Sequence, residues 1–325
     1  MLVLSATDVR ALLDLDELVE ALRVAMIDLS AGRMSAPPRV AALVPDRGAM
    51  LAAMPAYLPS AGALASKLVT LFPGNRDQPT HHALVCCFDP ATGVPAAVMD
   101  GGYLTAARTA AGSALATRLL ARPDARDVTV VGTGVQADAH ARALARLPGV
   151  QTVRIAGRDP ARAAALASSL AAAGVPAQAV SSVEAAVRAA SIVCTTTHAA
   201  HPVVRREWLR PGTHINSVGY NTSGDGELDT PTIQDALVVV ESQAAALAPP
   251  PAGAVELLRA IGRQAIDASH LAEIGQIAAG TVAGRADRDR LTVYKSVGVA
   301  AQDAAAAALV LDAAQRQGAG TIISL

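Results

Sequence analysis

Residues 128–144 read VTVVGTGVQADAHARAL, and this stretch decides the fold of the larger part of the 325-residue chain. An apolar, β-prone run leads into Gly132 and Gly134, and a segment typical of a helix follows directly. Gly132 permits a tight turn, Gly134 lets a ligand approach the backbone, and the small Ala137 lets the helix pack closely on the strand. The amino end of such a helix favours phosphate groups, because its free N–H groups and its dipole face them. This strand–turn–helix context predicts a dinucleotide-binding site.

The sequence around this motif alternates between strands and helices. Further strands are expected at TVRIAG, AQAV, SIVCTT, THINSVG and ALVVVES, with helices at 135–147, 160–174 and 182–190. Such alternation is typical of a parallel sheet with right-handed crossovers. The sequence therefore predicts an α/β fold, with a Rossmann doubly wound parallel sheet over residues 119–296.

The first hundred residues have a different texture. From Arg39 to Met99, short β-type runs are separated by turn signals, which is typical of antiparallel sheet. Residues 7–30 space their apolar side chains as a helix does, with Thr7 or Asp8 as the expected N-cap.

Two more helices are expected outside the parallel sheet, at 104–121 and at 296–316. The second is alanine-rich and has too little apolar surface to stand alone, so it should pack back on the N-terminal domain. Residues 1–118 and 297–325 are thus predicted to form one discontinuous α+β domain.

The second strand of the dinucleotide fold ends in GRDPAR, residues 157–162. An acidic residue there would bind the ribose 2′-hydroxyl of NAD, whereas an arginine suits the 2′-phosphate of NADP. Arg158 stands about where this residue is expected, with Arg162 as support. Asp159 has two possible roles, as the 2′-hydroxyl ligand or as the N-cap of the next helix. Arg158 favours NADPH as the cofactor, with NADH as the alternative.

Charge and composition exclude several classes of function. The net charge of −1 gives no reason to expect nucleic acid or a membrane surface as a partner. No apolar run reaches the ~18 residues of a membrane span, and the acidic N-terminal stretch is unlike a signal or transit peptide. The three cysteines lack metal-ligand spacing, so no metal site is predicted. We expect a cytoplasmic protein.

Lysine is rare in this chain. Of 27 basic residues only Lys67 and Lys295 are lysines. Such lysines can mark places that need a compact, titratable ammonium, although chance survival is the other interpretation.

Three basic residues of the first half stand in apolar surroundings: Arg39, Lys67 and Arg108. An unpaired ammonium in an apolar strand is costly, as at Lys67. Arg108 lies near the amino end of an almost chargeless helix, where the dipole disfavours a cation, so an anionic partner is expected. Each residue could belong to a structural ion pair. Their occurrence in one domain favours a carboxylate ligand, which arginine binds in bidentate fashion.

Several stretches resemble the ornithine cyclodeaminase/μ-crystallin family: SKLVTLFPGN, THHALVCCFDPATGVPAAVMDGGYLTAARTAAGSALAT, VVGTGVQA, PGTHINSVG, GELD and YKSVGVAAQDAAAAAL. The resemblance implies a homodimer whose N-terminal domains join their sheets, so that the discontinuous domain serves substrate binding and dimerisation. It also implies that Arg39, Lys67 and Arg108 surround the carboxylate and nitrogen of the substrate, with His81 as a minor candidate nearby. Lys295 would lie beside the nicotinamide end. The motif and the resemblance together give these cofactor-binding positions: Thr109, Gly132, Gly134, Val135, Gln136, Arg158, Thr195, Thr196, Val218 and Ser296.

The loop at 216–229, NSVGYNTSGDGELD, separates two chemistries of the family. Cyclodeaminases resemble G-G-D-x-P-G-K-x-E-L here, with an aspartate thought to handle the amine or water. Aligned on Gly219 and Glu227, that position is Asn221 in this chain. Asparagine is not a general base, but it can orient a substrate nitrogen or a carboxylate.

The acidic residues of this loop are expected to be less important. Asp225 could substitute for the missing aspartate or be a solvated loop residue. Glu227 and Asp229 are expected to stabilise the loop or start the next helix.

These observations predict an NAD(P)H-dependent reductase of α-imino acids, reversible as an amino-acid dehydrogenase, with imino or keto acids and amines as substrates. The catalytic residues would be Lys67, Arg108 and Asn221. Two alternatives remain open. One is a cyclodeaminase, a lyase that retains NAD; the other is a non-catalytic binding protein of the μ-crystallin type.

Overall fold

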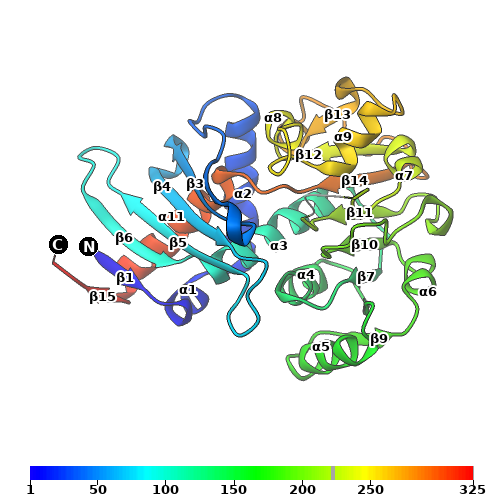
Figure 1. Cartoon of the computed structure of the whole chain (residues 1–325), viewed down its shortest axis with the longest axis horizontal. Helices are drawn as coiled ribbons and strands as arrows, with labels where there is room; N and C mark the ends of the chain where they lie inside the picture. Colours follow the sequence, from blue (N-terminus) through cyan, green and yellow to red (C-terminus); the bar gives the residue numbers. More distant parts are fainter. Residues whose placement is uncertain (221–223, 325) are drawn as a thin grey trace. The chain divides into compact units, whose positions relative to one another are not determined.

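The computed structural model describes residues 1–220 and 224–324 of the chain. These residues form two compact units. Unit 1 comprises Met1–Arg108 and Gly298–Leu325, and unit 2 comprises Thr109–Val297. Both units contain a sheet and helices, so the expected α/β class is confirmed (Figure 1).

Unit 1 contains a seven-stranded sheet in the order β15-β1-β6-β5-β4-β3-β2. Neighbouring strands run antiparallel except for β1 and β6, which are parallel. The strands are β1 (Leu2–Leu4), β2 (Val40–Val44), β3 (Ala49–Leu58), β4 (Ala63–Leu71), β5 (His81–Phe88), β6 (Pro95–Asp100) and β15 (Thr321–Ile322). The helices are α1 (Ala6–Leu12), α2 (Leu15–Ser30), the start of α3 (Gly101–Leu120) and α11 (Ala300–Gln317).

Helix α11 packs across β3 and β4 and also against α2 (Figure 1). The expectation that the last helix returns to the N-terminal domain is therefore confirmed. Strand alternation sets the two faces of the sheet. Met54 and Val85, the cross-strand neighbours of Lys67, are buried on the face that α11 covers.

The single helix predicted over residues 7–30 is wrong. Two helices, α1 and α2, occupy this stretch, and Ser5 rather than Thr7 or Asp8 is the first N-cap. The break occurs because Oδ1 of Asp14 accepts hydrogen bonds from the N–H groups of Asp16 and Glu17 at 2.8 and 2.9 Å. A side chain that satisfies these free donors starts a new helix.

Unit 2 contains an eight-stranded sheet in the order β13-β12-β14-β11-β10-β7-β8-β9, and every described pairing is parallel. Strand order reverses between β7 and β10, which makes this pair the switch point of a doubly wound sheet. The strands are β7 (Asp127–Val131), β8 (Thr152–Ala156), β9 (Ala177–Val180), β10 (Ile192–Thr195), β11 (His214–Ser217), β12 (Ala236–Val240), β13 (Leu271–Glu273) and β14 (Leu291–Lys295). Its helices are the rest of α3, then α4 (Val135–Ala145), α5 (Pro160–Ala172), α6 (Val183–Arg188), α7 (Thr230–Asp235), α8 (Gln243–Ala246), α9 (Val255–Gly262) and α10 (Ile274–Ala278).

Helices cover both faces of this sheet (Figure 1), so its central strands are buried throughout. Val193, Ile215 and Val293 in three neighbouring strands are fully inaccessible to solvent. The predicted strands did not include β1, β3, β13, β14 or β15. Strand β14 is adjacent to β11 although more than seventy residues separate them in the sequence, and pairing at that distance leaves no local signal.

Candidate functional site

Three charged side chains meet inside unit 1. The Nζ atom of Lys67, on β4, lies 2.8 Å from Oδ2 of Asp303 and 3.0 Å from its Oδ1. The Nε atom of Arg108, on α3, donates to the same Oδ1 at 3.0 Å. The three residues are only 3%, 5% and 1% exposed. One buried carboxylate on α11 therefore joins the two cations.

The local structure places each of these groups. Lys67 points to the sheet face that α11 covers, as its cross-strand neighbours do. Asp303 lies in the first turn of α11, where the helix dipole favours a negative charge. The same carboxylate supplies the anionic partner expected beside Arg108.

Two further contacts complete the cluster. Nη1 of Arg108 donates to Oε1 of Gln302 at 2.7 Å. Nη2 of Arg39, the residue before β2, donates to the carbonyl oxygen of Gly298 at 2.9 Å. The structure thus brings the three predicted cations to the amino end of α11.

The charges of the cluster shift its protonation equilibria. Burial lowers the pKa of Lys67 to about 8; the carboxylate of Asp303 opposes this shift, and the charges of Arg108 and Arg39 add to it. Burial by itself would raise the pKa of Asp303, but the charges of Arg108 and Lys67 hold this pKa below its ordinary value. Lys67 can therefore gain or lose a proton near neutral pH, while Asp303 stays a carboxylate.

Two cations contact the carboxylate of Asp303, and Arg39 lies at the same end of α11, so positive charge is in excess in this mostly buried place. Such an excess suits an anionic ligand, and Arg39 and Arg108 suit a carboxylate. The ion-pair interpretation applies to Lys67 and Arg108, which share Asp303. The interpretation as a site for a carboxylate ligand stays a prediction.

Sequence reasoning missed Asp303 and Gln302. A signal was present, because Asp303 is the only acidic residue between Asp289 and Asp312 and stands in an alanine-rich helix. A lone carboxylate in such a helix indicates a buried partner of opposite charge.

His81 lies away from this cluster. It is exposed on β5, with Nδ1 3.0 Å from the hydroxyl of Thr80. Strand β5 pairs Val85 with Lys67, so His81 lies four residues further along, which is about 13 Å in a strand.

The glycine motif of unit 2 has the backbone that a dinucleotide requires. Gly132 has a φ of +138°, and a Cβ there would lie 2.3 Å from Oγ1 of Thr196. At Gly134, by contrast, no heavy atom of the described chain lies within 4 Å of such a Cβ. Gly134 is also the N-cap of α4 and provides no side-chain cap. Open space therefore lies before the uncapped N–H groups of a helix, as a phosphate site needs.

The first turn of α4 adds a second observation. Val135 is 73% exposed. Oε1 of Gln136 is buried and has no hydrogen-bond partner among residues 1–220 and 224–324. Buried polar atoms are nearly always hydrogen-bonded, so this oxygen is suited to accept a hydrogen bond from a bound ligand.

The turn after β8 carries the two residues considered for cofactor preference. Arg158 is exposed. Oδ1 of Asp159 accepts hydrogen bonds from the N–H groups of Ala161 and Arg162 at 2.9 and 3.2 Å. The N-cap interpretation of Asp159 is therefore confirmed.

Thr195, the last residue of β10, and Thr196 direct their hydroxyl groups into the protein. Oγ1 of Thr195 donates to Glu227 at 2.6 Å. Oγ1 of Thr196 donates to the carbonyl oxygen of Val131 at 3.3 Å. These hydroxyls order the carboxyl edge of the sheet.

The remaining expected cofactor positions lie on other elements of unit 2. Oγ of Ser296 donates to Glu241 at 2.6 Å, and the N–H of Val218 donates to the carbonyl oxygen of Thr195 at 2.9 Å. Thr109 is buried in α3. Ser296 and Val218 directly follow β14 and β11, so both lie at the carboxyl edge of the sheet.

A model of the "Ornithine cyclodeaminase/mu-crystallin family" matches residues 1–318. The chain belongs to this family. It is 36% identical to the ketimine reductase mu-crystallin of Mus musculus over 300 residues, which cover 91% of each chain. The structure of Thermococcus litoralis Delta(1)-pyrroline-2-carboxylate reductase in complex with NADH and L-proline is similar at a TM-score of 0.94 and 33% identity, covering 99% of this chain and 100% of that one. An archaeal alanine dehydrogenase dimer with bound NAD matches at a TM-score of 0.91 and 32% identity, covering 100% and 99%.

Within this family member, Asn221 lies outside the described residues. The rest of its loop is described and is held by its acidic side chains. Glu227 is 1% exposed and accepts hydrogen bonds from the last residue of β10 and from residues just after β10 and β11. Asp229 is the N-cap of α7. The expectation that these two residues stabilise the loop and start the next helix is confirmed.

Asp225 forms ion pairs at the surface. Its Oδ1 lies 2.7 Å from Nη1 of Arg259 and 3.5 Å from Nη2 of Arg263. With 36% of its side chain exposed, Asp225 is a partly solvated loop residue that also pairs with two arginines.

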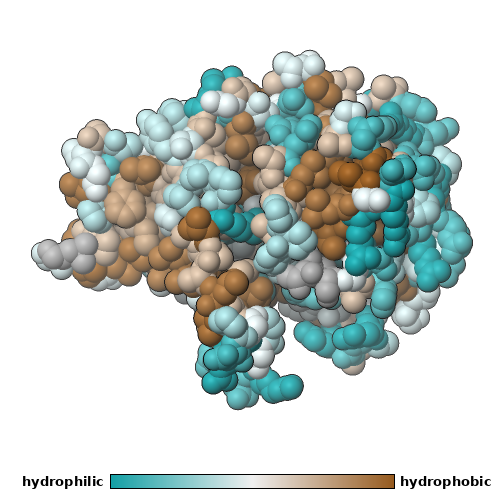
Figure 2. Space-filling model, turned by 45° about the horizontal axis from the view of Figure 1, so that its top comes forward, coloured by the Kyte–Doolittle hydropathy of each residue, from teal (hydrophilic) through white to brown (hydrophobic). Residues whose placement is uncertain are grey.

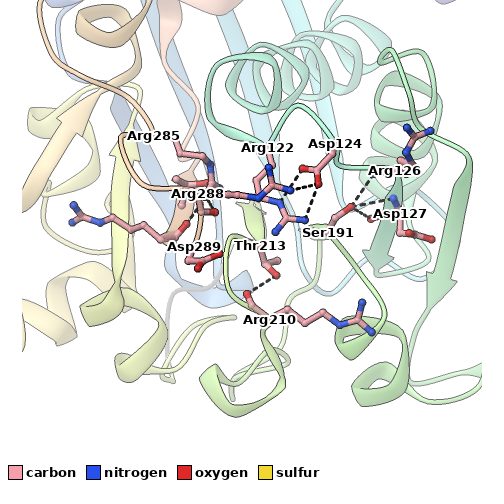
Figure 3. Close-up of polar contacts among 12 residues, drawn as sticks. Arg122, Asp124, Arg126, Asp127, Ser191, Arg210, Thr213, Arg285, Arg288 and Asp289 are labelled. Carbon is pink, nitrogen blue, oxygen red and sulfur yellow. Dashed lines mark hydrogen bonds and ion pairs between the residues drawn. The ribbon is translucent and has the colours of Figure 1, made fainter.

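The amino-terminal edge of the sheet carries a separate cluster of charges in this family member (Figure 3). Arg122 and Arg288 both pair with Asp124. Arg285 donates to the carbonyl oxygen of Leu120 at 2.7 Å, and burial lowers the pKa of its guanidinium. These groups tie loops together at the edge opposite the glycine motif, so they are structural.

No helix in the described part of the chain is both long and apolar enough to cross a membrane. Within the same residues, no cluster of three or more His, Cys, Asp or Glu side chains could hold a metal ion.

Proposed function

We propose that this protein reduces α-imino acids to amino acids with a nicotinamide dinucleotide. One observation carries the proposal: a titratable, buried ammonium, Lys67, lies in a cluster with an excess of cations that suits a substrate carboxylate. Imine reduction needs these two features together, an anchor for the carboxylate and a proton for the nitrogen. The reverse reaction is an amino-acid dehydrogenation.

Arg108 and Arg39 bind the α-carboxylate in this proposal. Arg108 is held in place through Nε by Asp303 and through Nη1 by Gln302. A guanidinium fixed by two partners is already ordered before the substrate arrives. Fixing the carboxylate also fixes the adjacent C=N carbon, and orientation of this kind lowers the barrier by several kcal/mol.

Lys67 supplies the proton to the imine nitrogen. Its pKa of about 8 keeps it an ammonium at neutral pH and makes it a stronger acid than an ordinary lysine. Asp303 contacts both Lys67 and Arg108, so it is the residue that aligns the proton donor with the carboxylate anchor.

The residues of unit 2 fit a nicotinamide dinucleotide, which supplies the hydride when bound. Gly134 and the uncapped start of α4 would receive the pyrophosphate. Oε1 of Gln136 is an acceptor, so it would take a hydrogen bond from a hydroxyl group of the dinucleotide, because the pyrophosphate itself offers no donor. NADPH is the proposed form, because Arg158 is exposed at the turn after β8 while Asp159 caps α5. The related structures contain NADH and NAD, which supports NADH as a second cofactor.

Asn221 is proposed to orient the substrate rather than to act as a base. Its amide can donate to or accept from the substrate, but it does not take a proton at working pH. This residue favours reduction over the cyclodeaminase chemistry of other family members.

The working form is proposed to be a homodimer in the cytoplasm. Figure 2 shows hydrophobic surface over the strands of unit 1. Val40, Leu68 and Leu84 form a register-aligned row across β2, β4 and β5 and are 65%, 36% and 50% exposed. Exposed apolar rows of this kind mark association surfaces. The three cysteines are free, which suits a reducing compartment.

The test is a substrate screen that follows NADPH absorbance. Keto acids with ammonia or methylamine, and the cyclic pyrroline- and piperideine-2-carboxylates, are offered to the wild type and to Lys67→Met. We expect turnover of at least one imine by the wild type, and loss of it in Lys67→Met with NADPH binding retained. Ammonia release from ornithine or lysine without NADPH consumption would instead indicate the cyclodeaminase.

A further inference from the structure

The peptide groups around Gly219, just after β11, are held at two points. Its N–H donates to Oε2 of Glu227 at 2.7 Å, and its carbonyl oxygen accepts from Nζ of Lys295 at 3.0 Å. A Cβ at this position would lie 2.2 Å from Cδ of Glu227 and 2.3 Å from the carbonyl oxygen of Thr197. Only glycine therefore allows this contact, which we call the Gly219 clamp, formed by Glu227 and Lys295.

Glu227 also binds the strand next to β11. Its carboxylate accepts from Oγ1 of Thr195 at 2.6 Å, and from the N–H and Oγ1 of Thr197 at 2.6 and 2.7 Å. One carboxylate thus fixes the ends of both β10 and β11. A buried carboxylate that accepts from several donors forms strong, directional bonds.

Lys295, the last residue of β14, brings a third strand into the same network. Its Nζ lies 2.9 Å from Oε1 of Glu256, and both side chains are only 3% exposed. Oγ of Ser217 donates to the same Oε1 at 3.2 Å. Burying charges costs desolvation energy, so replacing such a network by apolar residues is often neutral or stabilising. Its value here is the geometry that it fixes.

The network lies at the carboxyl ends of β10, β11 and β14, which are neighbours in the sheet (Figure 1). In a doubly wound sheet, ligands bind outside these ends, beside the switch point. The glycine motif after β7 receives the pyrophosphate, so the strands on the β10 side receive the nicotinamide half. Val218 and Ser296, which are expected to line the cofactor, directly precede Gly219 and follow Lys295.

We infer that the Gly219 clamp positions the backbone that receives the nicotinamide end of the dinucleotide. Glu227 and Lys295 are positioning residues, because they act through the peptide groups of Gly219. The inference rests on the proposed use of a nicotinamide dinucleotide, and it goes further in assigning a function to the second of the two lysines.

The test compares two ligands that differ only in the nicotinamide. NADPH and 2′-phospho-ADP-ribose are titrated into the whole protein by calorimetry. The variant Lys295→Met/Glu256→Gln removes the bond to Gly219 without leaving an unpaired buried charge. The matched control is Glu256→Gln, which keeps the donor to Gly219, and Glu227→Gln tests the other half of the clamp.

We expect the double variant and Glu227→Gln to bind NADPH more weakly, by up to about tenfold, because the free energy of one hydrogen bond is the most that the lost preorganisation of the Gly219 backbone can cost. Both should bind 2′-phospho-ADP-ribose as the wild type does, and Glu256→Gln should keep its NADPH affinity within about threefold. An equal loss for both ligands, or no loss for either, overturns the inference and leaves a purely structural network. The melting temperature of each variant is measured as well. If one of the two clamp variants does not fold, the ligand affinities of the other clamp variant test the inference.

These binding measurements need no imine substrate, so they separate the two proposals. A wild type that reduces no imino acid but shows the expected ligand pattern contradicts the proposed function and supports the clamp. A wild type that reduces imines, with variants that lose both ligands equally, contradicts the clamp alone.

Discussion

The ammonium of Lys67 lies 2.8 Å from the carboxylate of Asp303, although 236 residues separate them in the chain. Breaking such a buried pair is strongly destabilising, but forming it contributes little, because desolvation offsets the attraction. The pair therefore matters for its chemistry. It keeps a titratable ammonium next to the arginine that is proposed to bind the substrate carboxylate.

The pH dependence of the proposed reduction follows from Lys67. Below a pH of about 8 it is an ammonium and can donate a proton; above this pH it is an amine. We expect kcat/KM for imine reduction to fall as the pH rises through about 8, and amino-acid oxidation to rise over the same range. Initial rates in both directions check this, and a reduction rate that is flat across this range would contradict the role of Lys67.

Asp303→Asn removes the charge that opposes the lowering of the Lys67 pKa. We expect the pH limb of the reduction to move to lower pH in this variant. Two buried cations are left without their anion, so the free energy of unfolding should fall by about 3–5 kcal/mol. The control is Asp312→Asn on the exposed side of the same helix, whose pair with Arg316 is worth at most about 1 kcal/mol. Denaturant unfolding and pH profiles of both variants measure the effects; an unmoved limb in a folded Asp303→Asn would count against the assignment.

The two glycines of the dinucleotide motif should respond differently to alanine. In Gly132→Ala the new methyl group would clash with Oγ1 of Thr196, and alanine would have to adopt a φ of +138°. Stability and cofactor binding should both fall. The methyl group of Gly134→Ala would have no heavy atom of the described chain within 4 Å, so the melting temperature should stay within a few degrees of the wild-type value. Its NADPH affinity should nevertheless drop at least about tenfold, because the methyl group occupies the phosphate site. Wild-type affinity in Gly134→Ala would contradict the placement of the pyrophosphate.

Arg158→Ala separates the two cofactors. The guanidinium is proposed to bind the 2′-phosphate, so the affinity for NADPH should fall about tenfold while that for NADH, which lacks this phosphate, stays unchanged. Fluorescence titration with each nucleotide measures both affinities. An equal loss of affinity for NADPH and NADH would contradict the proposed contact between Arg158 and the 2′-phosphate.

The burial of both lysines predicts an unusual resistance to amine reagents. Lys67 and Lys295 are 3% and 2% exposed, and each is paired with a buried carboxylate. In the folded protein we expect neither lysine to react with an N-hydroxysuccinimide ester, and both to react after denaturation. Intact-mass and peptide spectra before and after unfolding decide this, and labelling of either lysine in the native state would contradict its burial.

The parallel sheet and its ligand motif were predictable because their signals are local. Each strand and the helix after it lie within a short stretch of sequence, and the spacing of Gly132, Gly134 and Ala137 is itself the geometry of the turn. Lys67 and Arg108 were found for a related reason: a charge in an apolar segment is costly wherever the segment lies. The break at Asp14 was missed because the apolar spacing continues across it.

What the sequence determined by itself was the α/β class, the family and the identity of the cations. What only the tertiary structure decided was how charges are paired. Asp303 forms ion pairs with Lys67 and Arg108, and Glu256 forms one with Lys295. The partners are separated in the sequence by dozens to hundreds of residues. The energy of an ion pair in a buried site depends on the distance between the charges and on the hydration that they lose. Neither quantity can be deduced from the spacing of the residues along the chain.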